Sequence, residues 1–140
     1  MEEAEELYAL RLKIEPDAVA AAACVAGAAD RTAARAALDA LNRSIDHHAE
    51  DSGRLNRAFH LTLVKPAKQA LTLQIVERLH IMAERYVRKH LEPLGRDTRA
   101  NEEHENILAA WTLGDTARVT ELTRLHISTT LDDLRKQFRA

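Results

Sequence analysis

Residues that interrupt helices are scarce in this chain and lie far apart. Only four glycines and three prolines occur among 140 residues, and these two residue types disfavour a helix interior most strongly. The segments between them are rich in Ala, Leu, Glu and Arg, which are good helix formers. Strands have almost no place to form, so we expect an all-α protein. The length suits a single domain with one core.

Apolar periodicity between the breaks predicts about six helices. The first begins near Glu2, is expected to be kinked or restarted by Pro16, and ends near Gly27, with Asp30 as a possible N-cap of the second. The other helices are expected at about 32–47, 51–64, 68–91, 98–111 and from 116 onward. The connections are short and therefore favour antiparallel neighbours, so we expect an antiparallel bundle.

The segment 68–91 is apolar on two sides when it is wound as a helix. One stripe contains Ile75, Leu79, Met82 and Tyr86, and the other contains Leu73, Val76, Ala83 and Val87. A helix that is apolar on two sides is central in its bundle or lies at a subunit interface. We expect the protein to form a homodimer.

Charge and hydropathy exclude several classes of protein. The formal net charge of −2 gives no strongly basic face, so this domain is not expected to bind nucleic acid by itself. The apolar run from Ala18 to Ala29 is too short to span a bilayer, and no basic-then-apolar signal opens the chain. The single Cys24 fits a reducing compartment, and its alanine neighbours predict a small buried side chain. We expect a cytoplasmic protein without membrane contact.

Three histidines stand where the helical pattern favours apolar side chains. His104 and His126 occupy positions on their helices where an aliphatic residue is expected, and His60 borders a similar stripe, four residues after Asn56. Each of them alone is read as a surface residue or a hydrogen-bonded core imidazole. Burying three imidazoles without partners costs a few kcal/mol each, however, and ligation of one divalent cation would turn this cost into binding energy. We expect a divalent metal ion, zinc first, with nickel or another transition metal as alternatives.

Several short motifs follow one another along the chain. They are Leu7-Tyr8-Ala9-Leu10-Arg11 with Glu15-Pro16, Asn56-Arg57-Ala58-Phe59-His60, Glu103-His104-Glu105-Asn106-Ile107-Leu108 with Gly114-Asp115, and Leu125-His126. Their order and spacing resemble a known family, the FCD ligand-binding domain of the FadR subfamily of GntR transcriptional regulators. The resemblance implies an all-α antiparallel bundle of about six helices around a buried metal and effector cavity. It also implies a metal bound by Asn56, His60, His104 and His126.

One departure from the family concerns Asn56, because members often have Asp at this position. An amide is a weaker, neutral ligand, so three imidazoles, one amide and a dication leave a net positive site that attracts an anion. Arg11 is the first candidate to hold a carboxylate beside the metal, and a solvated face of the first helix is its alternative. His80 either faces the same cavity or lies in a subunit contact.

Other basic residues are read as solvated. They are His47, His48, Arg85, Arg88, Lys89 and His90.

These observations predict a non-enzymatic sensor of a small organic acid. On this interpretation residues 1–140 are the effector-binding and dimerisation domain of a bacterial regulator, and DNA is bound only through an N-terminal winged helix-turn-helix that is absent from this chain. One alternative is a small metalloenzyme, a metal-assisted hydrolase or isomerase, but Glu103 and Glu105 are expected to point away from the face of His104 and leave no general base. Another alternative is a dimerisation module with a purely structural metal.

Overall fold

The computed structural model describes residues 1–47, 50–94 and 96–140, with only the backbone at residues 93 and 96–98, so His48 lies outside the described residues. The described residues form six α-helices and two short 3₁₀ turns. The helices are α1 (Glu2–Val25), α2 (Ala28–Asp46), α3 (Ser52–Thr62), α4 (Ala70–His90), α5 (Arg96–Thr112) and α6 (Thr116–Arg139), and the turns are η1 (Lys65–Ala67) and η2 (Glu92–Leu94). The described residues contain no strand. The prediction of an all-α bundle of six helices is confirmed.

Two details of the first two helices differ from the sequence prediction. Helix α1 continues through Pro16 without a break, and Pro16 is buried. Helix α2 begins at Ala28, four residues earlier than expected. The reason is that Asp30 lies inside the first turn and accepts a hydrogen bond from the Gly27 N–H at 2.9 Å. The N-cap is therefore Gly27, and Asp30 supports the helix start from the third helical position.

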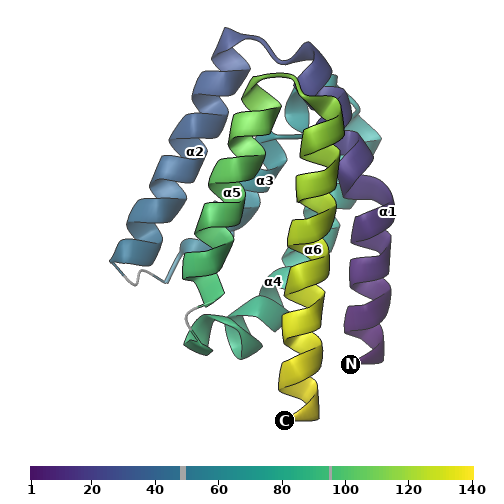
Figure 1. The fold of residues 1–140 in the computed structure, drawn as a ribbon, viewed down its shortest axis with the longest axis vertical. Helices are drawn as coiled ribbons and strands as arrows, with labels where there is room; N and C mark the ends of the chain where they lie inside the picture. Colours follow the sequence, from purple (N-terminus) through teal and green to yellow (C-terminus); the bar gives the residue numbers. More distant parts are fainter. Residues whose placement is uncertain (48–49, 95) are drawn as a thin grey trace.

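The six helices form a closed ring of neighbours. Around the ring, α1 contacts α6, α6 contacts α5, α5 contacts α2, α2 contacts α3, α3 contacts α4, and α4 contacts α1. Figure 1 shows the two chain ends together at one end of the bundle, with α1 and α6 side by side and α2 next to α5. Because the ring closes on itself, residues from helices far apart in sequence can face one interior.

The interior contains two apolar clusters. The larger cluster is built around Trp111, Phe59 and Leu38, and the smaller around Leu79 and Leu134. On α1 the buried charged residues Arg11 and Glu15 fall between Leu7 and Tyr8 of the smaller cluster and Ala18 and Val19 of the larger. On α6 buried Thr123 and His126 fall between Val119 and Ile127, which belong to different clusters. A buried polar layer therefore separates two apolar regions.

The exposure of surface residues shows that the prediction of a buried Cys24 is wrong, and it is compatible with the predicted subunit interface on α4. Cys24 is exposed rather than buried, since its helix presents alanines on several sides and other residues of α1 face the core. On α4, Leu71, Ile75 and Ile81 are exposed apolar side chains, which is compatible with the expected subunit interface. Among the described residues, no helix combines the length and the apolar character that a bilayer crossing requires.

Candidate metal centre

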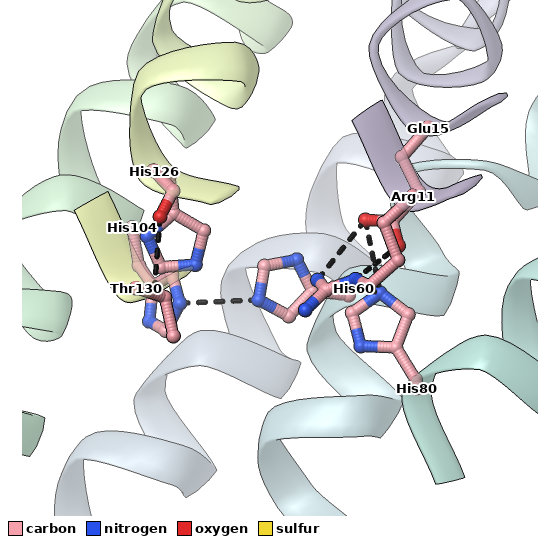
Figure 2. A network of polar contacts seen from close by, with 7 residues as sticks. All are labelled: Arg11, Glu15, His60, His80, His104, His126 and Thr130. Carbon is pink, nitrogen blue, oxygen red and sulfur yellow. Dashed lines mark hydrogen bonds and ion pairs between the residues drawn. The ribbon is translucent and has the colours of Figure 1, made fainter. Parts of the chain in front are cut away.

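Three helices bring the three predicted histidines together inside the bundle. His60 comes from α3, His104 from α5 and His126 from α6, and all three side chains are buried. Their ring centroids lie 4.7–5.4 Å apart, and one nitrogen from each ring lies within 4.8 Å of the other two. Figure 2 shows His60 facing His104 and His126 across the interior. The convergence predicted from periodicity is present.

Burial favours the neutral form of two of these rings, His60 and His104. Desolvation lowers the pKa of His60 well below its ordinary value, and the neighbouring His80, His104 and His126 lower it further. Burial also lowers the pKa of His104 well below its ordinary value, with further contributions from His126 and His80. A neutral imidazole keeps one nitrogen lone pair, which is what a metal ion requires of a histidine ligand.

The spacing of two of the three rings, His60 and His104, fits a divalent cation. The Nε2 atoms of His60 and His104 are 3.1 Å apart, and two nitrogens that bind one zinc ion lie about 2.9–3.4 Å apart, depending on the angle between the bonds. Among the described residues, Nε2 of His104 has this contact with His60, and the buried Nδ1 of His104 has no hydrogen-bond partner. The donor set and its spacing therefore fit a nitrogen-ligated transition metal.

Glu103 is the residue that the sequence prediction placed wrongly. It was expected to point away from the site, but its Oε2 lies 2.5 Å from Nδ1 of His126. The carboxylate must accept this hydrogen bond, so Nδ1 carries the proton and Nε2 is the nitrogen left to bind a metal. Glu103 also contacts Arg99 at 3.3 Å. Carboxylates that fix the tautomer of a metal-binding histidine commonly occupy this position. Glu105 does point away, because it pairs with Arg35 on the outer surface.

A second polar cluster lies against His60. Arg11 donates hydrogen bonds to Glu15 at 2.6 and 3.2 Å, and Nε2 of His80 lies 3.1 Å from the Glu15 carboxylate. The His80 ring stacks on His60 with centroids 4.8 Å apart. Figure 2 places His60 between this cluster and the pair formed by His104 and His126. The structure thus connects Arg11 and His80 to the three-histidine cluster through one ring.

The charges of the second cluster stabilise one another. Burial opposes ionisation of Glu15, but Arg11 and His80 outweigh it and hold the pKa of the carboxyl well below its usual range. Burial also opposes the charge of Arg11, yet Glu15 and Tyr8 raise its pKa. The pKa of His80 is lowered because desolvation outweighs the attraction of Glu15. Arg11 and Glu15 are therefore a buried ion pair beside a neutral imidazole.

A pocket opens next to both clusters. It has a volume of about 100 Å³ and is lined by residues from all six helices. Apolar side chains such as Leu41, Ile45 and Val87 form part of its wall, and the half-buried ion pair of Arg57 with Glu84 forms another part. Glu84 packs so closely on Gly53 that a Cβ at that position would lie 2.7 Å from its carboxylate. The pocket offers a small ligand both apolar contacts and charged groups.

All six predicted site residues line this one pocket. They are Arg11, Asn56, His60, His80, His104 and His126. The solvated-face alternative for Arg11 is wrong, because the side chain is buried. Metal ligation, the contribution of Asn56, and effector contacts of Arg11 and His80 stay predictions. His47 is exposed, as expected, and so are Arg85, Arg88 and Lys89.

Comparisons with known proteins identify a family and a solved structure of similar fold. The FCD domain model matches residues 6–129. The structure is similar to that of E. coli McbR/YncC, with a TM-score of 0.82 and 19% sequence identity, over 95% of this chain and 68% of that one. No curated protein matches the chain.

Proposed function

Because the chain belongs to the FCD domain family, we propose that it is the effector-sensing domain of a GntR-type transcriptional regulator. The membership confirms the resemblance that the sequence motifs indicated. In this proposal residues 1–140 bind a small organic acid and mediate dimerisation, and a winged helix-turn-helix attached before α1 contacts DNA. The domain itself performs no catalysis.

The observation that carries this proposal is the convergence of three buried histidines on the wall of one pocket. His60, His104 and His126 would hold a divalent metal ion, with Asn56 as a fourth ligand. When bound, the metal supplies a Lewis-acidic, positively charged position for a carboxylate. Neutral imidazoles do not cancel that charge, so the site favours an anion over a neutral ligand. Zinc is our first choice, and nickel or another transition metal would suit the same donors.

The surrounding residues orient the ligand and exclude water. The apolar wall favours a small organic acid over a hydrated inorganic anion, because apolar side chains cannot replace the water molecules that the inorganic anion would lose on binding. Arg11 and His80 border the pocket next to His60 and are the proposed effector contacts on that side. Helix α1 carries Arg11 and also the N-terminus. A ligand that binds Arg11 can therefore shift α1, the helix to which a DNA-binding domain would be joined.

Metal and acid titrations test the proposal. We expect protein purified without a histidine tag to contain about one divalent metal ion, and an acid at about 100 times its dissociation constant to raise the melting temperature by roughly 10 °C. The rise should disappear after chelation and in His104→Ala. His47→Ala, which removes an exposed histidine at the end of α2, is the matched control and should respond as the wild type does. Equal stabilisation of metal-free and metal-loaded protein would refute a metal-bound effector.

Two competing functions have distinct outcomes in the same experiments. A metalloenzyme requires a free base, whereas Glu103 is engaged by His126 and Arg99; turnover of an ester or carboxylate substrate that His104→Ala abolishes would favour it. A structural metal predicts that chelation lowers the melting temperature while no acid raises it.

The homodimer also belongs to the proposal. The exposed Leu71, Ile75 and Ile81 on α4 are the first candidates for its interface. Sedimentation analysis of Ile75→Glu should give a monomer where the wild type gives a dimer.

A further inference from the structure

The two carboxylate oxygens of Glu103 contact two different residues. Oε2 lies 2.5 Å from Nδ1 of His126 on α6, and Oε1 lies 3.3 Å from Nε of Arg99, one turn earlier on α5. The Glu103 side chain is 21% exposed. A glutamate side chain has several rotatable bonds, so a contact at one oxygen limits where the other oxygen can point. The direction in which Glu103 meets His126 therefore depends on what holds its other oxygen.

Arg99 is itself held by a buried carboxylate. Its Nη2 lies 2.5 Å from Oδ2 of Asp133 on α6, and the Asp133 side chain is 2% exposed. Asp133, and after it Glu103, raises the pKa of Arg99 against the opposing effect of burial. A guanidinium presents its N–H donors in a rigid plane, so one arginine can serve two carboxylates at once. Arg99 therefore joins Glu103 and Asp133 in one arrangement.

These contacts link α5 to α6 at two places. Glu103 of α5 meets His126 of α6, and Arg99 of α5 meets Asp133, two turns further along α6. The links run beside the pocket, whose wall includes both Arg99 and His126. A change at Arg99 can therefore reach the proposed metal ligand His126 through Glu103.

Glu105, on the same helix, uses its carboxylate differently. Nη1 and Nη2 of Arg35 donate to its two oxygens at 2.8 Å each. This ion pair is exposed, and Arg35 does not line the pocket that the histidines share. One arginine thus binds both oxygens of Glu105, whereas Glu103 keeps one oxygen for a histidine. Arg35 is therefore a matched control for Arg99.

We propose that Arg99 is a positioning residue of the metal centre, which holds the Glu103 carboxylate against Nδ1 of His126 and so leaves Nε2 of that ring for the metal. This inference rests on the proposed function and deepens it. Arg99 acts only through Glu103. Its loss should therefore weaken metal binding less than the loss of Glu103 does, roughly three- to tenfold rather than 10–100-fold.

Competition for zinc with a chromophoric chelator tests the path through Glu103. Arg99→Gln should lower the zinc affinity roughly three- to tenfold, and Arg35→Gln should leave it unchanged. In a Glu103→Gln background, Arg99→Gln should have less than about a twofold further effect, because the residue that it positions is already altered. An equal loss in both backgrounds, or an unchanged affinity in Arg99→Gln alone, would overturn the inference.

Nitrogen NMR of the histidine rings gives a readout that requires no metal. In metal-free protein at about pH 8, where ordinary histidines are neutral, the His126 ring should carry its proton on Nδ1. Arg99→Gln should move part of this proton to Nε2, while Arg35→Gln should give the wild-type spectrum. Unchanged His126 signals in Arg99→Gln would overturn the inference even if the zinc affinity fell, since that loss would come from net charge or from the fold. If the wild type binds no divalent metal, the proposed function fails, and the NMR experiment still decides whether Arg99 orients His126.

Arg99→Lys covers the case in which Arg99→Gln does not fold. Its ammonium still offers a positive charge to the buried Asp133, but it lacks the planar fork that reaches two carboxylates. The zinc affinity and the His126 signals should then change in the direction expected for Arg99→Gln. Wild-type values of both in Arg99→Lys would overturn the inference.

Discussion

Two clusters of buried polar residues meet at His60, and they differ in how many of their polar atoms have a hydrogen-bond partner within the cluster. Arg11, Glu15 and His80 pair with one another through contacts of 2.6–3.2 Å. On the other side, His60 and His104 share a single contact and His104 keeps a nitrogen without a partner among the described residues. Both clusters are buried to the same degree, so exposure does not explain the difference.

The difference indicates a division of roles within one layer. A cluster whose charges are paired keeps its geometry without a ligand, and it can therefore position its neighbours. A cluster of neutral lone pairs that face one another is stable only when something binds them or when the rest of the fold offsets its cost. We infer that the Arg11 cluster is a preformed part of the scaffold that can present Arg11 and His80 to the effector, whereas the three-histidine cluster is the place where the metal binds. Four predictions test this comparison.

Removing the negative charge from the scaffold cluster should have the largest effect. Glu15→Gln leaves Arg11 buried at 5% exposure without a counter-charge, and loss of one partner from a buried pair costs about 3–5 kcal/mol of unfolding free energy. Urea denaturation measures this loss. Arg11→Met combined with Glu15→Gln should recover most of it, because no unpaired charge remains. Glu121→Gln, which breaks the exposed pair with Arg118, should cost less than about 0.5 kcal/mol. If Glu15→Gln lost as little unfolding free energy as Glu121→Gln, the Arg11–Glu15 pair would not be part of the scaffold.

Acid should destabilise the metal-free protein first through its buried histidines, before its buried carboxylate contributes. The pKa values of His60, His80 and His104 are lowered by burial in the folded state, whereas the unfolded chain protonates its histidines near pH 6.5. Below that pH the unfolded chain binds more protons, so stability falls as pH falls. Glu15, with a lowered pKa, adds its own loss only below about pH 4.5, where the unfolded carboxyl protonates. We expect roughly 2–3 kcal/mol of lost stability between pH 7.5 and 5.5.

The control for the pH experiment is a pair of histidine variants. His104→Gln should reduce the pH dependence, because one of the buried histidines is removed, while His47→Gln should leave it unchanged because His47 is exposed. A pH-independent unfolding free energy across this range in the chelated wild type would show that His60, His80 and His104 are not held neutral.

The sequence predicted the helices and the three-histidine cluster because both follow from local spacing. The breaks at Gly27 and Gly114 separate consecutive helices. A histidine at an apolar position of an amphipathic helix must face the interior wherever that helix packs. Ring closure then brings His60, His104 and His126 together. The same reasoning failed for Cys24, which was expected to be buried, because a stretch of alanines has no clear apolar face from which burial can be predicted.

Contacts between helices could not be derived in this way. Glu15 meets His80 across 65 residues, and Glu103 meets His126 across 23. Helical spacing shows only that Glu103 lies off the face of His104. It does not show that α6 packs along that side of α5 and presents His126 there. The scaffold cluster and the orienting carboxylate therefore depend on tertiary packing, whereas the ligand cluster was visible in the sequence.

Glu103 tests whether the ligand cluster is oriented by its surroundings. Glu103→Gln weakens the hydrogen bond that fixes the His126 tautomer, and changes at such positions typically cost 10–100-fold in metal affinity. Competition with a chromophoric chelator measures the affinity. Glu105→Gln is a matched control from the same helix, because Glu105 pairs with Arg35 at the surface and should leave the affinity unchanged. Equal effects of both variants would mean that the loss comes from net charge rather than from orientation of His126.

Asn56→Asp should give the smallest change and the one most informative about the ligand. A carboxylate in place of the amide adds a negative charge to the pocket wall, so a bound dication should be held more tightly, on the order of tenfold. The same charge repels a second carboxylate, so acids should bind the metal-loaded variant more weakly. Asn56→Ala separates the two effects, since it removes the amide without adding charge and should weaken metal binding. If Asn56→Asp tightens the metal and leaves acid affinity unchanged, the acid does not bind beside the metal, and the ligand cluster holds the cation alone.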